Sequence, residues 1–305
     1  MLFDQLTIID SCRLTESGMQ QIAAFSRQPL VRFYGVPASD EETLARIGAS
    51  DCVLVSWQTP LRAEVIAAAP RLRYIGMCCS LYSETSANVD IVAAKGLGIT
   101  VQGVRDYGDE GVVEFIFAQL INLFKGYGPY QWRAEPVELG GKSLGIIGLG
   151  TLGRMVADTA RHFGMEVCYF GRTRRPEAEQ KGIRFLPLPE LLAHCDVIST
   201  HLPKHTILLD EEAFQHKKAN SIFINTSLGL TFDESALLHW LEKDKTSFAI
   251  FDSDGAGSRY ATFSQRSNII VYPRSAGFTE ESKVRLTRKV IANLESFLDG
   301  DSKQA

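Results

Sequence analysis

The chain has 305 residues, of which 45% are hydrophobic and 22% charged, and its formal net charge is −4. This profile is typical of a water-soluble globular protein large enough for two domains. The negative charge argues against a general nucleic-acid binder, which needs a basic face. No run of about 18 apolar residues is present to span a membrane. The opening stretch MLFDQLTIIDSCR lacks the basic start of a signal peptide, so we expect a cytoplasmic protein.

The cysteines do not predict a metal centre. No C-x-x-C pair is matched by a second pair at zinc spacing, and most of the thiols fall in apolar, strand-like runs. We therefore expect buried free thiols, a common use of cysteine. The six positions are Cys12, Cys52, Cys78, Cys79, Cys168 and Cys195.

The first hundred residues alternate short apolar runs with amphipathic ones. Two of the amphipathic runs, EETLARIG and RAEVIAAAP, predict helices, the second ending at Pro70. Strands separated by helical crossovers indicate a small parallel sheet. The predicted strands are 6–10, 31–35, 51–56, 72–78 and 98–103.

The stretch EGVVEFIFAQLINLFKG, residues 110–126, is apolar on nearly every side. A helix of this kind is buried all round, either between domains or against a partner chain. The following segment, 127–142, contains several Gly and Pro residues, which predict a loop.

A second series of strands and helices starts at SLGIIGLG. The chain then ends in an amphipathic helix over 281–300. The strand-containing stretches of this series are 143–150, 166–171, 195–203, 219–227, 247–254 and 268–273.

IIGLGTLGR fits the pattern G-x-G-x-x-G with Gly148, Gly150 and Gly153. The pattern alone is weak, but here it follows a strand and opens a helix, which is the context of a dinucleotide site. The three glycines allow a tight turn, close approach of a pyrophosphate, and packing of helix on strand. The helix start at Thr151 and Leu152 would present free N–H groups to the phosphates. A purely structural turn is the alternative.

The next strand indicates which dinucleotide binds. An acidic residue about 20 positions after the first glycine would bind the ribose 2′-OH of NAD. This chain has Gly171 there, followed by Arg172, Thr173 and Arg174. Because this turn carries arginines and no carboxylate, it favours binding of the 2′-phosphate of NADP. NAD, with a merely solvated basic turn, is the alternative.

These motifs resemble the D-isomer-specific 2-hydroxyacid dehydrogenase family. The matching stretches, in the family's order and spacing, are ELGGKSLGIIGLGTLGR, CDVISTHLPKHT, INTSLGLTFDESAL, FAIFD and YPRSAGFTEE. The resemblance implies an α/β protein in which a Rossmann dinucleotide-binding domain, 107–279, is inserted in a flavodoxin-like substrate domain, 1–106 plus 280–305. It also implies a homodimer through the helix at 110–126. Further cofactor contacts are implied for His201, Pro203, Thr226 and Asp252.

The same resemblance shows substitutions at the catalytic positions. The family uses an Arg for the substrate carboxylate, a His that exchanges the proton, and a Glu that raises the pKa of that His. These positions hold Leu228, Arg274 and Gly257 in this chain. The substrate loop departs too, because Thr85 and Ala87 stand where the family has a Gly.

Other groups are candidates for the proton donor. Tyr82 and Tyr107, with Asp109, Glu110 and Asp254, lie in segments that border the cleft in the family. A tyrosine is the best neutral acid among them, and a neighbouring arginine would lower its pKa.

Arg274 is charged at neutral pH and cannot serve as an acid, but its forked donors suit a carboxylate or phosphate. We expect it to hold an anionic group of the substrate. The alternative is an ion pair with Asp252, Asp254 or Glu280.

The sequence thus favours an NADP-dependent oxidoreductase with an altered active site and a small-molecule substrate, and Arg274 favours an anionic one. The alternative is a catalytically inactive nucleotide-binding sensor or scaffold, and a residual 2-hydroxyacid dehydrogenase comes third. A preserved Asp252 favours the enzyme, because it would anchor the nicotinamide carboxamide, whereas the lost acid–base residues favour the sensor.

Overall fold

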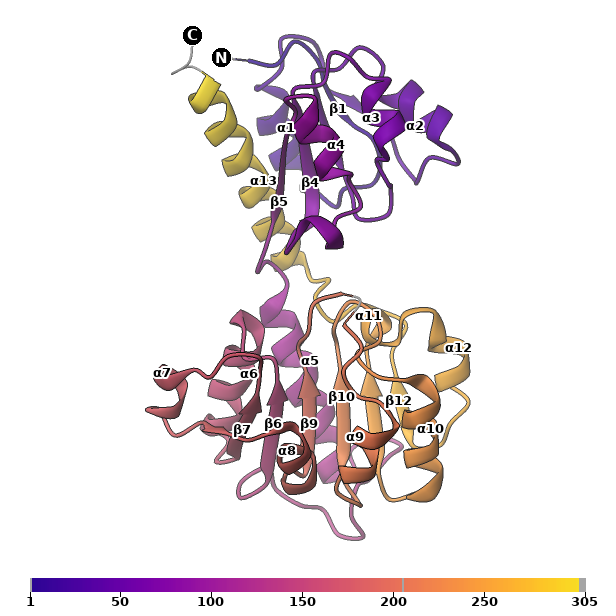
Figure 1. Ribbon diagram of the computed structural model, residues 1–305, viewed down its shortest axis with the longest axis vertical. Coiled ribbons are helices and arrows are strands. Elements are labelled where there is room, and N and C mark those ends of the chain that lie inside the picture. The colour runs from indigo at the N-terminus through magenta and orange to yellow at the C-terminus, as the bar shows by residue number, and fades with distance from the viewer. Residues whose placement is uncertain (1, 205, 302–305) are drawn as a thin grey trace. The chain divides into compact units, whose positions relative to one another are not determined.

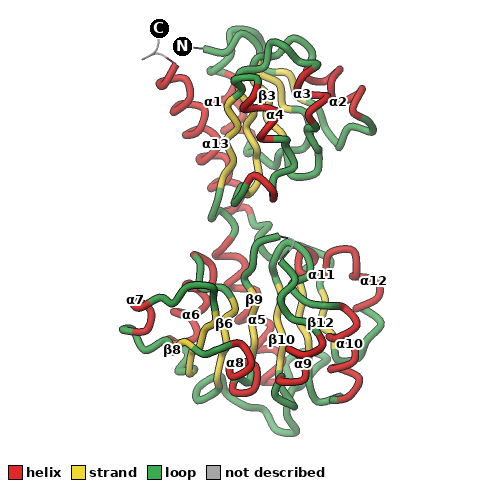
Figure 2. Tube along the Cα trace, viewed as in Figure 1, coloured by secondary structure: helices red, strands yellow, loops and turns green. Residues whose placement is uncertain are grey.

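The computed structural model describes residues 2–204 and 206–301. The chain divides into two compact units (Figures 1 and 2). Unit 1 comprises the residues up to Tyr107 together with those from Thr279 onward, and unit 2 comprises Gly108–Phe278. Each unit is built on a parallel sheet with helices on both faces, which confirms the predicted α/β class.

Unit 1 contains a five-stranded sheet in the order β2-β1-β3-β4-β5, and every pair is parallel. This is the strand order of flavodoxin-like folds. The predicted strand over 31–35 is shorter than expected, because the chain leaves the sheet edge before Gly35, which has a φ of +72°. The strands are β1 Leu6–Ile8, β2 Val31–Arg32, β3 Cys52–Val55, β4 Tyr74–Ser80 and β5 Thr100–Val104.

The helices of unit 1 cover two hydrophobic cores, one on each face of the sheet. Side chains cap several of them: Thr15, Ser39 and Asp90 accept backbone N–H groups in the first turns of α1, α2 and α4. The long last helix, α13, packs on β4 and β5. The helices are α1 Glu16–Ala23, α2 Asp40–Ile47, α3 Ala63–Ala67, α4 Ile91–Gly96 and α13 Glu280–Asp301, with a 3₁₀ turn at Glu84–Ser86.

Unit 2 contains a seven-stranded parallel sheet in the order β12-β11-β10-β9-β6-β7-β8. From β6 the chain first adds β7 and β8 on one side of the sheet and then returns to add β9 to β12 on the other side. Rossmann folds reverse their strand order in the same way. All carboxyl ends lie at one edge because every pair is parallel. The strands are β6 Ser143–Ile147, β7 Glu166–Phe170, β8 Arg184–Phe185, β9 Val197–Thr200, β10 Ile222–Asn225, β11 Phe248–Phe251 and β12 Ile269–Val271.

Two cores also flank this second sheet, one against α5 and α6 and one against α8, α9 and α10. The helices are α5 Asp109–Lys125, α6 Thr151–His162, α7 Pro176–Glu179, α8 Leu188–His194, α9 Glu211–His216, α10 Glu234–Lys243, α11 Ser253–Ala256 and α12 Tyr260–Phe263, with a 3₁₀ turn at Gly257–Arg259. No helix among the described residues is long and apolar enough to cross a membrane.

The apolar helix α5 is exposed on one side in the single chain, so the predicted burial on every side would require a partner chain. Its apolar face, including Ile116 and Leu120, enters the core of unit 2. Glu114, Ala118 and Asn122 are exposed on the other side. The sequence did not indicate this exposed side, because the residues between Glu114, Ala118 and Asn122 are mostly apolar.

Candidate functional site

The glycine-rich turn lies at the carboxyl end of β6 and has no room for side chains. Gly148 has a φ of +98°, and a Cβ there would lie 2.3 Å from the carbonyl oxygen of His201. A Cβ on Gly153 would lie 2.2 Å from the carbonyl oxygen of Gly148. By contrast, a Cβ on Gly150 would meet nothing within 4 Å. The first and third glycines are therefore required by packing, and the second borders open space.

The open space lies at the start of α6. Its N-cap, Gly150, offers no side chain to accept the first N–H groups, which include those of Thr151 and Leu152. Such groups carry the partial positive end of the helix dipole and favour a phosphate. The turn and the helix start together form a cradle for the pyrophosphate of a dinucleotide.

The arginines after β7 differ in what they contact. Arg174 donates to Glu179, with 3.1 Å between Nε and Oε1, and its guanidinium lies 5.1 Å from the ring centre of Phe185. Arg172 and Thr173 are exposed, and within the described chain the Arg172 guanidinium has no ion-pair partner. Arg172 is thus free to contact an anion, whereas Arg174 is already neutralised.

His201 follows β9 and faces the glycine turn. Its N–H donates to the carbonyl of Ile147 at 2.8 Å, and its Nε2 lies 3.1 Å from the Ser199 hydroxyl. Burial lowers the pKa of His201 to about 4, so the imidazole is neutral at physiological pH. Among the described residues no partner reaches its Nδ1. Pro203 lies two residues further along the same loop.

The end of β10 carries Thr226, whose buried hydroxyl also has no partner within the described residues. Buried polar atoms are normally hydrogen-bonded, so the Thr226 hydroxyl and the His201 Nδ1 fit a polar ligand such as a dinucleotide. The sequence interpretation missed the neighbouring Asn225. Its amide donates to the carbonyls of Gly229 and Gly255, at 3.0 and 2.9 Å, and so joins two loops of this edge. The sequence signal that could have identified Asn225 is a polar residue at the end of an otherwise apolar strand.

Asp252 directly follows β11 as the N-cap of α11 and is 1% exposed. Its two carboxyl oxygens accept the backbone N–H groups of Gly255 and Ala276, each at 2.8 Å. Burial raises the pKa of Asp252 to about 7, although these hydrogen bonds oppose the rise. The carboxyl group therefore lies at the same edge as the glycine turn and remains able to accept a further hydrogen bond.

The three positions that the resemblance aligns with the family's catalytic residues also lie at the carboxyl edge. Leu228 follows β10 and is 44% exposed, Gly257 ends α11 with a φ of +53°, and Arg274 follows β12. The Arg274 guanidinium is exposed and forms no ion pair with a described residue of unit 2. Asp252 is engaged as above, and Asp254 accepts the Ser275 hydroxyl at 2.5 Å. Arg274 is therefore an unpaired cation among the described residues of unit 2, and no residue at these three positions offers a side chain that exchanges a proton at neutral pH.

The two candidate tyrosines belong to unit 1. Tyr82 is 45% exposed, and the Arg105 guanidinium lies 5.4 Å from its ring centre. Burial raises the pKa of Tyr107 to about 12, which is opposite to the expected lowering by a neighbouring arginine. Its phenol is therefore protonated but a weak acid. Thr85 lies in the 3₁₀ turn after β4, and Ala87 directly follows that turn. Asp109 and Glu110 open α5, and Asp254 lies in α11.

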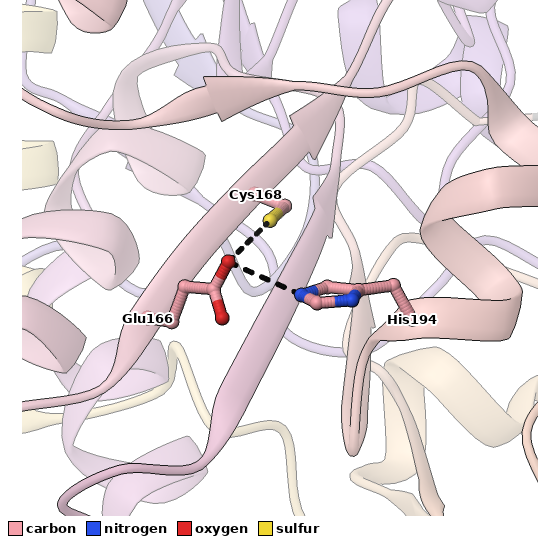
Figure 3. A group of neighbouring side chains, drawn as sticks. All are labelled: Glu166, Cys168 and His194. Atoms are coloured by element: carbon pink, nitrogen blue, oxygen red, sulfur yellow. Dashed lines mark hydrogen bonds and ion pairs between the residues drawn. The ribbon is translucent and has the colours of Figure 1, made fainter.

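All six cysteines are buried free thiols, as expected. The opposite edge of the unit 2 sheet, however, brings one of them to two other polar groups. Glu166, Cys168 and His194 place an oxygen, a sulfur and a nitrogen within 4.8 Å of one another (Figure 3). A hydrogen bond with the Cys195 thiol and contact with Arg184 lower the pKa of Cys168 to about 7, against the effect of burial. Cysteine spacing could not reveal this group, because only one of its members is a cysteine and His194 comes from a separate element, α8.

The glycine turn makes opposite predictions for two alanine substitutions. Gly150→Ala should leave the thermal midpoint unchanged but weaken dinucleotide binding, because its methyl group enters the space next to the helix start. Gly153→Ala should cost about 1–3 kcal/mol of stability through overpacking against Gly148. Fluorescence titration with NADPH and thermal unfolding measure the two effects. Equal losses of stability in both variants would contradict this assignment.

The raised pKa of Asp252 predicts how stability depends on pH. An unfolded Asp titrates near 3.9, whereas the folded group titrates at about 7. Between these values the folded state holds the extra proton, so its stability falls as pH rises. The thermal midpoint of wild type should therefore fall relative to that of Asp252→Asn between about pH 4 and about pH 7. Parallel pH profiles for the two proteins would show that the carboxyl group is not perturbed.

Comparison with known proteins agrees with this geometry. Residues 125–275 match the model of the D-isomer specific 2-hydroxyacid dehydrogenase NAD binding domain. A hydroxypyruvate reductase of Blautia hydrogenotrophica is 30% identical over 281 residues, which cover 85% of this chain and 86% of that protein. A glyoxylate reductase of Korarchaeum cryptofilum is 27% identical, covering 87% of this chain and 85% of its own length. An acyclic imino acid reductase, solved with NADPH and D-Arg, superposes with a TM-score of 0.81 at 26% identity and 97% coverage of both chains. The cradle for a nicotinamide dinucleotide and this similarity along the chain lead to one conclusion: the chain belongs to the D-isomer-specific 2-hydroxyacid dehydrogenase family of oxidoreductases.

Proposed function

We propose that this protein is an NADPH-preferring reductase with an altered active site, acting on a small substrate that carries an anionic group. One contrast supports the proposal. The cofactor edge of unit 2 keeps its glycine turn, its buried polar atoms without partners and Asp252. The positions aligned with the family's proton-exchanging residues hold Gly257 and a charged Arg274 instead.

The preference for NADPH rests on the charges after β7. Arg172 is exposed and unpaired among the described residues, and Thr173 beside it offers a hydroxyl. A 2′-phosphate would form a charge-assisted hydrogen bond with this guanidinium. Arg174 would add a weaker contribution, since Glu179 already neutralises it. NAD remains the alternative cofactor.

The missing proton donor favours a substrate that already carries its proton. Hydride addition to a carbonyl builds an alkoxide, which must then be protonated. A protonated imine is different: the hydride bonds to carbon, the C=N π electrons become the nitrogen lone pair, and a neutral amine results. This step needs no acid from the protein. The similarity to an acyclic imino acid reductase supports this substrate class.

Arg274 would then bind the substrate rather than catalyse the reaction. Its exposed guanidinium stands at the end of β12 without an ion pair in unit 2. The aligned carboxylate-binding position holds Leu228, so a carboxylate needs another cation. The planar fork of Arg274 can hold both carboxylate oxygens.

The second candidate function is a nucleotide-binding sensor or scaffold without turnover. The loss of every proton-exchanging side chain at the aligned positions favours it. In that case NADPH would bind and no carbonyl or imine would be reduced, so binding and turnover must be measured separately.

We also propose a homodimer formed through α5. The exposed strip of this helix contains the small residue Ala118 beside Glu114 and Asn122, next to the half-buried Phe115 and Ile121. Burying that strip against a second copy would remove apolar surface from water. Light scattering on the purified chain measures the mass directly, and a monomer would contradict the proposal.

Arg172→Gln should weaken NADPH binding by about 10- to 100-fold, the value of one charged hydrogen bond, and should leave NADH binding unchanged. Arg174→Gln is the matched control, because it removes a neighbouring guanidinium that Glu179 already engages. Its effect on the ratio of the two dissociation constants should be much smaller. Fluorescence titration with both cofactors measures the ratio. Equal affinity of wild type for NADPH and NADH would refute the preference.

Turnover should depend on the amine. NADPH oxidation with a 2-oxo acid alone, such as glyoxylate or hydroxypyruvate, should be negligible, and excess ammonium should raise it at least tenfold by forming the imine. Arg274→Gln should raise KM for the acid more than it lowers kcat. Rapid turnover of glyoxylate without amine, near the usual kcat of about 10 s⁻¹, would reject the altered active site. NADPH binding without turnover of any substrate would instead support the sensor.

A further inference from the structure

A compact polar cluster lies at the amino edge of the unit 2 sheet, away from the cofactor turn. Glu166 opens β7, Cys168 lies two residues further along the same strand, and His194 ends α8 (Figure 3). The Glu166 Oε1 lies 3.1 Å from the His194 Nε2 and 3.8 Å from the Cys168 Sγ. Three different metal-ligand atoms thus face one point.

A cation already occupies that point. The Arg184 Nη2 lies 2.9 Å from the Glu166 Oε1, 3.0 Å from the His194 Nε2 and 3.7 Å from the Cys168 Sγ. A guanidinium can only donate hydrogen bonds, so the other three groups turn their lone pairs toward Arg184. Arg184 is about half exposed, with 52% of its side chain open to solvent, and can leave without disturbing the core.

Arg184 leaves this cluster incompletely satisfied. The His194 Nε2 faces an oxygen of Glu166, which only accepts when ionised, and a nitrogen of Arg184, which only donates. One ring nitrogen cannot both carry and lack a proton. A metal ion resolves the conflict, because it takes a lone pair from each of the three ligands.

We propose that Glu166, Cys168 and His194 bind a borderline-soft divalent ion of the Zn²⁺ class in place of the Arg184 guanidinium. Tetrahedral zinc with normal bond lengths separates N from O by about 3.3 Å and S from O by about 3.6 Å. The corresponding distances in this structure are 3.1 and 3.8 Å. The third pair, N and S, lies within 4.8 Å, against about 3.6 Å at tetrahedral zinc. A mixed set of sulfur, nitrogen and oxygen ligands suits Zn²⁺ rather than Mg²⁺ or Ca²⁺, and water would complete the coordination.

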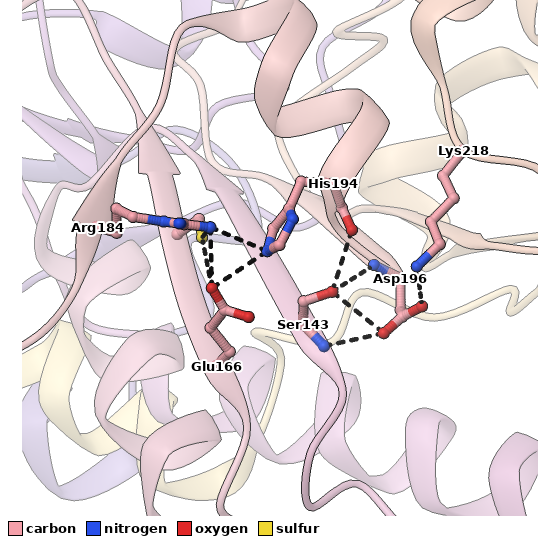
Figure 4. A network of polar contacts seen from close by, with 7 residues as sticks. Ser143, Glu166, Arg184, His194, Asp196 and Lys218 are labelled. Atoms are coloured by element: carbon pink, nitrogen blue, oxygen red, sulfur yellow. Dashed lines mark hydrogen bonds and ion pairs between the residues drawn. The ribbon is translucent and has the colours of Figure 1, made fainter.

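A neighbouring network holds the histidine in place (Figure 4). The Ser143 hydroxyl lies 3.4 Å from the carbonyl oxygen of His194 and 3.1 Å from Asp196. Asp196 also accepts the Ser143 N–H at 3.0 Å and the Lys218 ammonium at 2.7 Å. Because these bonds tie the end of α8 to β6, the main chain that carries His194 is held in place before an ion binds.

The test uses the full chain after treatment with a chelator. Co²⁺ is titrated and followed by its thiolate-to-metal charge-transfer absorption, and Zn²⁺ is then added as a competitor. We expect one Co²⁺ per chain, an absorption band that shows a thiolate ligand, and displacement by Zn²⁺. Cys168→Ser should abolish the band, and Glu166→Gln and His194→Gln should each weaken binding at least about tenfold.

Two further variants make the test specific. Arg184→Gln should bind Co²⁺ about two- to fivefold more tightly, because the competing cation is gone. His239→Gln is the matched control: its imidazole lies 3.6 Å from Glu211 in an exposed pair without a thiol, so binding should not change. The exposed His194 side chain keeps the test valid even if Cys168→Ser does not fold.

Several results would overturn the proposal. They are the absence of a thiolate band in wild type, its persistence in Cys168→Ser, an unchanged affinity in His194→Gln, and unchanged or weaker binding in Arg184→Gln. The readout is metal binding rather than activity, so it stands or falls separately from the proposed reductase function.

Discussion

The close approach of two main-chain segments at Gly148 is the constraint on which the cofactor edge depends. The carbonyl oxygen of His201 occupies the place of a Cβ at this residue. The N–H of Gly148 donates to Phe170 of β7, and the N–H of His201 donates to Ile147 of β6. The end of the central strand is thus tied to both of its neighbours. This arrangement fixes where α6 begins and which way its free N–H groups point.

Two side chains, those of Asn225 and Asp252, fix the loops that follow β10, β11 and β12 at the same edge. Asn225 holds the loop carbonyls of Gly229 and Gly255. Asp252 receives the N–H groups of Gly255 and Ala276. Both residues lie at the ends of buried strands, where unsatisfied backbone groups would be costly. The loops that carry Leu228, Gly257 and Arg274 are therefore held by hydrogen bonds from a rigid sheet, which is how a site gains precise geometry.

The two edges of this sheet attract ions of opposite charge. The carboxyl edge presents N–H groups, Arg172 and Arg274, all of which attract anions. The amino edge gathers the lone pairs of Glu166, Cys168 and His194 around a cation. In the proposed function, Arg274 stands at the position of the family's proton-exchanging histidine and carries a fixed positive charge. Such a charge can bind and orient a substrate, but the proton must come with the substrate or from another group.

Local sequence determined every strand except the short edge strand β8, most of the helices and the glycine turn, because these features depend on apolar periodicity and on short spacings along the chain. The Rossmann context of Gly148, Gly150 and Gly153 is one example, since strand, turn and helix follow one another directly. The length of β2 and the exposed side of α5 were not determined locally. They depend on where neighbouring elements stop covering the chain.

Only the tertiary structure decided which charged side chains are free and which are engaged. Arg172 and Arg174 are equivalent in sequence, yet Glu179 and Phe185 engage only the second, because α7 and β8 fold back onto it. The cluster of Glu166, Cys168 and His194 likewise depends on the parallel register of β7 and on the point where α8 ends. Glu166 and Cys168 are neighbours on one strand, but His194 reaches them only when strands and helices are packed, so the spacing in the sequence carries no signal of the site.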